Sequence, residues 1–371
     1  MKKYMYTKKN QLNKSRATVC VMILLVLCMQ YPHKEKDIFF ELTTQMVPLL
    51  TYEQEYGSDD MDYASSYDVP EWFYEDEDAL PANGDIVMME QVADKAVTKP
   101  EIEDVTEDKT KGITYTRQEL SKPDFLLQKI FVVDANTSMT EEELNLSTLL
   151  DTDLSLPDWN GEAYKVLIYH THASESFVDS RPGHPEDTIV GVGAHLAELL
   201  EQKYGVKVYH DTTTYDMIDG KLDRSKAYEN SYYGVSKILE EYPSIEVVID
   251  LHRDGVDEET HLVTDIKGKK TAKIMFLNGV SRSEMNGEIA YLENPNKLMN
   301  LSFSFQMYLK GKEYYGDFIR KIYVRSLRYN LHVMPRATLI EVGAQNNTLE
   351  EEKNAMEPLA AILDKVLSKD K

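Results

Sequence analysis

Cysteine is nearly absent from this chain, and its two copies stand where they exclude most thiol chemistry. Among 371 residues only Cys20 and Cys28 occur, and both lie in one apolar stretch near the N-terminus. The rest of the chain has no thiol, so no disulfide can cross-link it and no cysteine can act there as a nucleophile. A metal site outside this stretch would need His, Asp and Glu as its ligands.

Positive charge is also scarce. The chain has 41 Lys and Arg against 64 Asp and Glu, which gives a formal net charge of -23. The stretch 52–110 alone holds nineteen Asp or Glu against three Lys and contributes -16 of that total. Because no basic stripe exists that could neutralise phosphates, the composition argues against a nucleic-acid partner.

One apolar run, Ala17–Met29, has the surroundings of a membrane signal. Basic residues precede it, namely Lys2, Lys3, Lys8, Lys9, Lys14 and Arg16. Positive charge before the run orients the rest of the chain to the outside of the cell membrane. The run is shorter than the roughly 20 residues of a comfortable span, and its length also fits a cleaved signal peptide. Because no small-residue cleavage site follows, we expect an uncleaved, single-pass anchor, with the rest of the chain outside the cytoplasm; cleavage is the alternative.

Composition divides the chain into three parts. We expect residues 1–35 to form a basic cytoplasmic tail and the anchor, 36–122 an acidic and largely disordered linker, and 123–371 a folded domain. The linker cannot bury enough apolar surface to offset its chain entropy. Its aromatic triplet 72–74 is either a short docking motif or an incidental part of a solvated spacer.

From residue 123 onward, strand patterns alternate with helix patterns. Strands are predicted over 166–169, 206–209, 247–251, 273–277 and 338–342, and helices over 189–204, 225–242, 296–322 and 349–366. A further helix is predicted to open at Thr140, with a threonine cap and early negative charge. Hydrophobic residues make up 42% of the chain, which is enough to build a core. This alternation predicts an α/β fold, with a mainly parallel sheet and helices on both faces.

Histidines and carboxylates gather at the ends of the predicted strands. His170 and His172 follow one strand, His252 follows another, and Glu341 lies in a third. Because the carboxyl ends of parallel strands meet at one edge of a sheet, these side chains should converge. Glu175, three residues after His172, could supply a carboxylate ligand, or it could simply be the acidic residue at a helix start. The set predicts a zinc hydrolase.

Glu341 is embedded among Leu339, Ile340 and Val342. A buried, unpaired charge is costly, so this carboxylate must have a partner or a function. Burial would raise its pKa and suit it to accept a proton and pass it to a leaving amine. The alternative is that Arg253 or another base simply pairs with it.

Several of these segments together resemble the stage II sporulation protein P family, from about Pro123 to the C-terminus. They are His170-Thr-His172-Ala-Ser-Glu175-Ser-Phe177, Asp250-Leu-His252-Arg-Asp254, Arg325-Ser-Leu-Arg328-Tyr-Asn-Leu-His332, and Leu339-Ile-Glu341-Val-Gly343 followed by Asn347-Thr-Leu-Glu350. The resemblance implies a membrane-tethered N-acetylmuramoyl-L-alanine amidase with the phosphorylase/hydrolase-like fold of the zinc amidases. It also implies peptidoglycan as substrate, peptide cross-link cleavage in some members, and thinning of the septal wall during engulfment. A lytic transglycosylase and a multi-spanning membrane protein are the implied partners.

The same resemblance implies roles for individual residues. His172, Glu175 and His252 would hold Zn²⁺, with His170 as the alternative to His172 and Asp187 as the alternative to Glu175. Glu341 and Arg253 would be the catalytic residues, with Glu341 as the catalytic glutamate, and Arg253 and His210 would face the cleft. Two other classes stay open, which are a different wall-acting metallohydrolase, such as a carboxypeptidase or deacetylase, and a non-catalytic scaffold that recruits wall enzymes.

Overall fold

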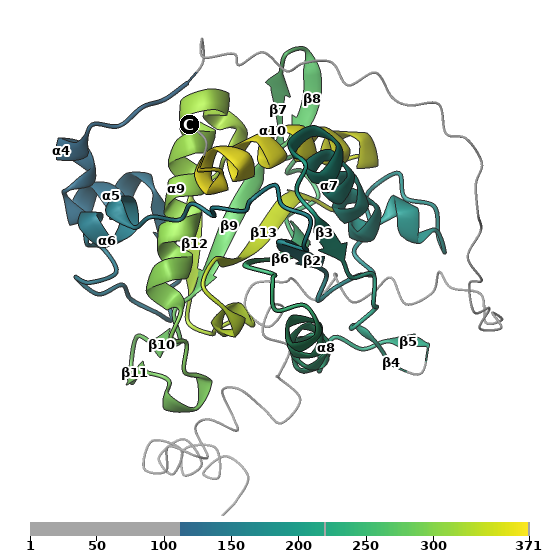
Figure 1. Ribbon diagram of the computed structural model, residues 1–371, viewed down its shortest axis with the longest axis horizontal. Helices are drawn as coiled ribbons and strands as arrows, with labels where there is room; N and C mark the ends of the chain where they lie inside the picture. Colours follow the sequence, from purple (N-terminus) through teal and green to yellow (C-terminus); the bar gives the residue numbers. More distant parts are fainter. Residues whose placement is uncertain (1–111, 219, 370–371) are drawn as a thin grey trace, which may run out of the picture. The chain divides into compact units, whose positions relative to one another are not determined.

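The computed structural model describes residues 112–218 and 220–369 (Figure 1). The predicted anchor at 17–29 and the acidic stretch 52–110 lie outside these residues. Within the described ranges, no helix combines the length and apolar character that crossing a membrane requires.

A seven-stranded sheet forms the centre of the fold (Figure 1). Its strands, in spatial order, are β1 (Phe131–Val133), β12 (Ile322–Arg325), β9 (Ile274–Gly279), β13 (Ala337–Ala344), β6 (Val247–Asp254), β2 (Val166–Tyr169) and β3 (Val208–His210). All neighbouring pairs are parallel except β9 and β13, which are antiparallel. The prediction of a mainly parallel sheet is confirmed, and β13, β6, β2 and β3 form the parallel half that carries the candidate site.

Helices cover both faces of the sheet, as the strand–helix alternation predicts. One hydrophobic cluster packs α7 (Ile189–Tyr204), α9 (Lys297–Tyr315) and α10 (Leu349–Leu367) against one face. A second cluster packs α8 (Ala227–Glu241) against the other face, where Figure 1 shows it apart from the other three. Because both faces are covered, central strands such as β2 are apolar and buried along their whole length.

Short elements complete the described chain. They are the helices α4 (Arg117–Leu120), α5 (Pro123–Lys129) and α6 (Leu146–Asp151), the hairpins β4–β5 (Met217–Ile218, Lys221–Leu222), β7–β8 (Val263–Ile266, Lys269–Ala272) and β10–β11 (Arg282–Ser283, Gly287–Glu288), and the 3₁₀ turns η3 (Pro185–Asp187), η4 (Ala290–Leu292), η5 (Gly316–Phe318) and η6 (Leu331–Val333). Helix α4 lies within the last residues of the predicted linker, so regular structure begins slightly before residue 123.

Two predicted helix boundaries are wrong. The helix predicted over 296–322 ends at Tyr315, because Gly316 adopts a left-handed φ of 55° that stops it. The 3₁₀ turn η5 follows directly, and strand β12 begins at Ile322. The helix predicted to open at Thr140 begins only at Leu146, because the Asn145 side chain accepts hydrogen bonds from the Ser147 and Thr148 amides and caps it there.

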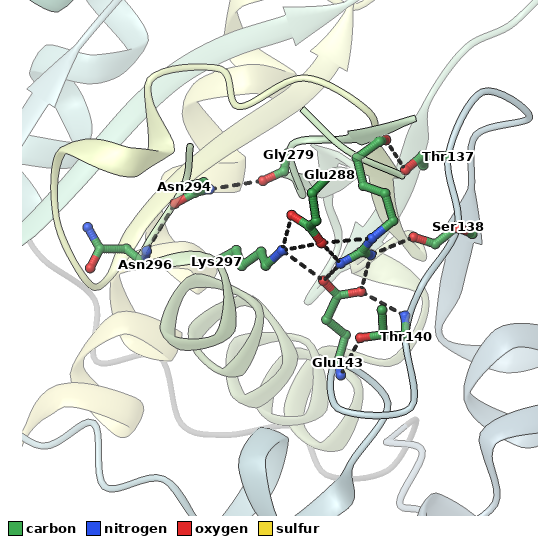
Figure 2. A network of polar contacts seen from close by, with 10 residues as sticks. Thr137, Ser138, Thr140, Glu143, Gly279, Glu288, Asn294, Asn296 and Lys297 are labelled. Atoms are coloured by element: carbon green, nitrogen blue, oxygen red, sulfur yellow. Dashed lines mark hydrogen bonds and ion pairs between the residues drawn. The ribbon is translucent and has the colours of Figure 1, made fainter. Parts of the chain in front are cut away.

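A buried ion-pair network fastens the β10–β11 hairpin to the segment before α6. The Arg282 guanidinium donates to both oxygens of Glu143, at 2.6 and 2.8 Å, and also to Glu288. Lys297, at the start of α9, reaches the same two carboxylates (Figure 2). The side chain of Glu143 is only 1% exposed, whereas that of Glu288 is 59% exposed. If Glu143 were lost, water could not easily take its place beside the Arg282 guanidinium, whereas water can reach the site of Glu288.

Candidate metal-binding and catalytic site

The sheet brings the predicted residues to one edge. Strands β2 and β6 are parallel neighbours, so His172, three residues past β2, comes near His252 in β6. Strand β13 lies on the other side of β6, and its Glu341 is the register partner of His252. Three strands far apart in the sequence thus supply the two imidazoles and one carboxylate.

His172 has a buried ring with no polar partner among the described residues. Its ring lies perpendicular to that of His252, with centroids 5.3 Å apart. The residue is 2% exposed, and neither ring nitrogen has a hydrogen bond within the described ranges. Burial, together with the nearby positive charge of Arg224, lowers the pKa of His172 to about 3. The imidazole is therefore neutral, which is the form that binds metals.

Glu175 supplies a carboxylate beside His252. Its Oε2 atom lies 3.6 Å from His252 Nδ1 and accepts a hydrogen bond from the backbone amide of Arg253 at 3.0 Å. Burial alone would raise the pKa of Glu175, but the His252 imidazole and the Arg253 charge hold it well below its usual range. Glu175 is thus an ionised, buried carboxylate.

The second ring nitrogen of His252 faces another buried carboxylate. Nε2 lies 2.8 Å from Asp250 Oδ1, although the two groups are not aligned as a regular hydrogen bond. Burial disfavours the imidazolium, yet Asp250 and Glu175 together raise the pKa of His252 well above its usual range. A carboxylate on one ring nitrogen is the usual arrangement for a metal-binding histidine, since it orients the ring and leaves the other nitrogen to the ion. That other nitrogen is Nδ1, on the side of Glu175. Because the raised pKa favours the imidazolium, an ion at Nδ1 would bind by displacing its proton.

These donors fit a zinc ion in type, and one pair of them also fits in spacing. Ligand atoms about 2.0–2.2 Å from a tetrahedral zinc ion lie roughly 3.3–3.6 Å from each other, and Glu175 Oε2 and His252 Nδ1 are 3.6 Å apart. The nitrogens of His172, which have no hydrogen bond among the described residues, would provide the third donor. In the part of the chain that the structure describes, no three His, Cys, Asp or Glu side chains already converge as a formed metal-binding group.

Glu341 has the properties of a general base held back from solvent. Its Oε2 atom is buried and has no hydrogen-bond partner among the described residues. Burial, reinforced by the negative charge of Asp254, raises the pKa of Glu341 to about 8. Arg320 donates to Asp254 at 2.6 Å and so is occupied by that carboxylate. A carboxyl group with a pKa near neutrality can both take up and release a proton.

The two alternative ligands are engaged elsewhere. His170 Nδ1 donates to the carbonyl of Leu251 at 2.9 Å, and its Nε2 lies 2.9 Å from Nε2 of His210. Asp187 binds the guanidinium of Arg181, which holds the pKa of that carboxyl at about 2. The geometry therefore brings His172 and Glu175, rather than His170 and Asp187, to His252.

Arg253 binds the loop that carries Glu175. Besides its backbone contact with Glu175, its guanidinium donates to the carbonyl oxygen of Ser176 at 3.1 Å. This contact fixes the position of the Glu175 carboxylate relative to β6. A direct part in the chemistry stays a prediction.

The family assignment comes from sequence comparison. The model of the family described as stage II sporulation protein P matches residues 74–364. This chain belongs to that family. A curated relative, the stage II sporulation protein P of Bacillus subtilis (strain 168), is 26% identical over 218 residues, which cover 56% of this chain and 52% of the relative. The match thus spans about half the length of that family member.

Solved structures of N-acetylmuramoyl-L-alanine amidases show a weaker likeness to this family member. The enzyme from Clostridium difficile 630 matches with a TM-score of 0.36 and 14% identity, over 57% of this chain and 100% of the other. AmiC2 of Nostoc punctiforme matches with a TM-score of 0.32 and 14% identity, over 54% and 96% of the two chains. Likeness at this level assigns no chemistry to this chain.

Sequence reasoning passed over Asp250 and Tyr228. Asp250 is a carboxylate inside an apolar strand, the same signal that singled out Glu341, and burial there again requires a partner or a role. The ring of Tyr228, in α8, lies parallel to that of His252 and edge-on to that of His172. No local pattern in the sequence marks such a contact between α8 and the sheet edge.

Proposed function

We propose that this protein is a zinc-dependent N-acetylmuramoyl-L-alanine amidase, which cleaves the amide between N-acetylmuramic acid and the L-alanine of the peptidoglycan stem. The observation that carries the proposal is the meeting of His172, Glu175, His252 and Glu341 at one edge of the sheet. Membership of the stage II sporulation protein P family supports peptidoglycan as the substrate.

In this proposal His172, Glu175 and His252 hold Zn²⁺. The bound ion would supply a water of lowered pKa and an electrophile for the amide carbonyl. Glu341 takes the proton of the attacking water at its carboxylate and delivers it to the nitrogen of the leaving L-alanine. The closed surroundings of its Oε2 atom exclude bulk water from that transfer. Arg253 keeps Glu175 in place while this happens.

The cellular setting is part of the same proposal. The basic residues before the apolar run 17–29 favour a membrane-anchored protein whose catalytic domain lies outside the cytoplasm. Family membership supports action on the septal wall during engulfment, with a lytic transglycosylase and a multi-spanning membrane protein as partners, and leaves room for cleavage of peptide cross-links.

The test is product analysis of digested peptidoglycan. Purified sacculi are incubated with the full-length protein, with and without a zinc chelator, and the soluble products are identified by mass spectrometry. An amidase releases free stem peptides that begin with L-alanine, and the chelator should stop the release. Glycan strands that keep their stems in all conditions would overturn the proposal.

The same experiment separates the rival classes. A carboxypeptidase would shorten stems that stay attached to the glycan, and a deacetylase would leave free amino groups on the sugars. A non-catalytic scaffold would release nothing, even with zinc added. The ionised Glu175 and the unpartnered His172 favour the catalytic reading over the scaffold, because buried groups of this kind are costly without a function.

A further inference from the structure

A buried chain of hydrogen bonds runs from the turn before β13 to the carboxylate beside His252. Asn330 Nδ2 lies 3.0 Å from Ser231 Oγ, and Ser231 Oγ lies 3.0 Å from Thr171 Oγ1. Thr171 Oγ1 in turn lies 2.7 Å from Asp250 Oδ2, and the Thr171 amide donates to Asp250 Oδ1 at 2.9 Å. The same Oδ1 atom is 2.8 Å from Nε2 of His252. All members of the chain are buried.

The available donor protons fix the direction of each hydrogen bond in this series. A carboxylate only accepts, so the single hydroxyl proton of Thr171 points to Asp250. The Ser231 hydroxyl has two acceptors in reach, Thr171 Oγ1 at 3.0 Å and the Tyr228 carbonyl at 3.3 Å. The shorter contact assigns its proton to Thr171, and its oxygen is left to accept from Asn330. A backbone carbonyl also only accepts, and that of Tyr228 lies 2.8 Å from Asn330 Nδ2. The amide nitrogen of Asn330 therefore faces both acceptors, and every bond polarises the next one toward Asp250.

The backbone at Asn330 is held in an uncommon conformation. Tyr329 and Asn330 have φ angles of 49° and 56°, in the left-handed region that non-glycine residues seldom adopt. Such strain collects at functional sites, where the surroundings impose it. The Tyr329 ring packs edge-on against Tyr228, whose ring is stacked on His252. The turn thus reaches the metal-binding histidine by two routes, one polar and one aromatic.

We propose that Asn330 is a positioning residue for the metal site, acting on His252 through Ser231, Thr171 and Asp250. The inference rests on the proposed zinc-dependent function. This proposal assigns a role to a residue of the segment Arg325–His332, none of whose residues has a role in the proposed amidase chemistry. Asn330 touches neither substrate nor metal in this proposal. Its effect is to hold Asp250 in the one orientation that accepts from Thr171 and faces Nε2 of His252.

Two variants of the full-length protein test this. Asn330→Asp keeps the size of the side chain and the tolerance for a left-handed φ, but removes both amide donors. Asn330→Gly keeps the backbone conformation and removes the whole side chain. For each we expect zinc affinity, measured by competition with a chelator, to fall about 10- to 100-fold, the range seen when groups that orient metal ligands are lost.

Asn300 provides the matched control. It is a buried asparagine in α9 that donates to the carbonyl of Leu331 and accepts from the amide of Ala337. It therefore supports the same β12–β13 connection without touching the hydrogen-bond chain. Asn300→Ala should lower the melting temperature yet keep zinc affinity within about twofold of wild type. If the Asn330 variants also keep wild-type zinc affinity, the positioning role is refuted.

A metal-free readout separates this inference from the proposed function. In chelator-treated protein, a double-mutant cycle of Asn330→Gly and Thr171→Val should be less than additive in stability, although the two residues touch only through Ser231. Additive effects would refute the coupled chain. Wild-type protein that binds no zinc at all would instead overturn the proposed function. The double-mutant cycle would still show whether Asn330 and Thr171 are coupled through the hydrogen bonds.

Discussion

Glu341 and His252 are register partners across the parallel strands β13 and β6. The pairing places a carboxyl group of raised pKa beside an imidazole that lies 3.6 Å from Glu175. A shift of one residue in this register would turn the Glu341 side chain to the opposite face of the sheet. The register of the central strands is therefore what joins the proton-transfer group to the candidate metal site.

Replacing Glu341 with glutamine should remove activity and leave the metal in place. The amide has nearly the shape of the carboxyl group but cannot accept the proton, so we expect a rate loss of about 10²- to 10⁴-fold on peptidoglycan. Zinc content should stay at the wild-type level. Glu198→Gln, on an exposed part of α7, is the control and should be fully active. A Glu341→Gln variant with near-wild-type rate would remove this residue from the mechanism.

His172→Ala and His252→Ala should each lose bound zinc. Each change removes one of three donors, so metal content determined on purified, dialysed protein is expected to fall far below one ion per chain. His195→Ala is the matched control, because His195 lies on α7 and its side chain is 36% exposed. Wild-type zinc stoichiometry in either test variant would refute the ligand assignment.

The Arg282 network predicts a large difference between two glutamates. Glu143→Gln leaves the buried guanidinium short of its enclosed partner, so we expect a loss of about 3 kcal/mol in the free energy of unfolding. Glu288→Gln alters the exposed partner and should cost less than about 1 kcal/mol. Urea unfolding of both variants measures the difference. Equal losses would show that Glu143 is not the principal partner of Arg282.

A side chain at Gly343 is expected to destabilise the fold. It has a φ of 50° in the irregular part of β13, and a Cβ there would collide with the buried carboxyl of Glu352. Strain and overpacking together predict a loss of about 2–5 kcal/mol for Gly343→Ala. Gly268→Ala, with a φ of 81° and open space around the position, should cost only about 1–2 kcal/mol. Thermal or urea unfolding compares the two, and similar losses would contradict the collision.

The His332 ring should make the fold sensitive to mild acid. Burial, with the charge of Arg328 nearby, lowers its pKa to about 4, and its ring is stacked on that of Tyr232. Between about pH 6.5 and 4, His332 binds a proton in the unfolded chain but not in the folded one. The free energy of unfolding therefore falls as the pH falls through this window.

His332→Phe keeps an aromatic ring stacked on Tyr232 and removes the group that takes up a proton. Its stability should therefore fall less steeply than that of wild type from pH 6.5 to 4, by about 1–2 kcal/mol after allowance for partial exposure of the ring. His184→Phe, at an exposed position, should follow the wild-type curve. Urea midpoints across this range measure the effect, and parallel curves for wild type and His332→Phe would rule it out.

Much of the fold was predictable because its signals are local. Helix α7 has the predicted bounds, since its apolar periodicity and the left-handed Gly205 that ends it are both written in neighbouring residues. The mainly parallel sheet follows from the alternation of strands and helices. The antiparallel β9–β13 pair and strand β12 were missed, because strand order and direction depend on pairing between distant segments.

For the candidate site, the amino-acid sequence was enough to predict the kinds of groups and their places in or just after apolar strands, namely His172, Glu175, His252 and Glu341. The choice between His172 and His170, and between Glu175 and Asp187, came from contacts in the folded chain. In the fold, His170 contacts Leu251 and His210, and Asp187 binds Arg181. His172 has no polar partner among the described residues. The physical reason is that a side chain's chemistry depends on what lies within a few ångströms of it. Strand register and helix packing set those neighbours, and nearby sequence does not encode them.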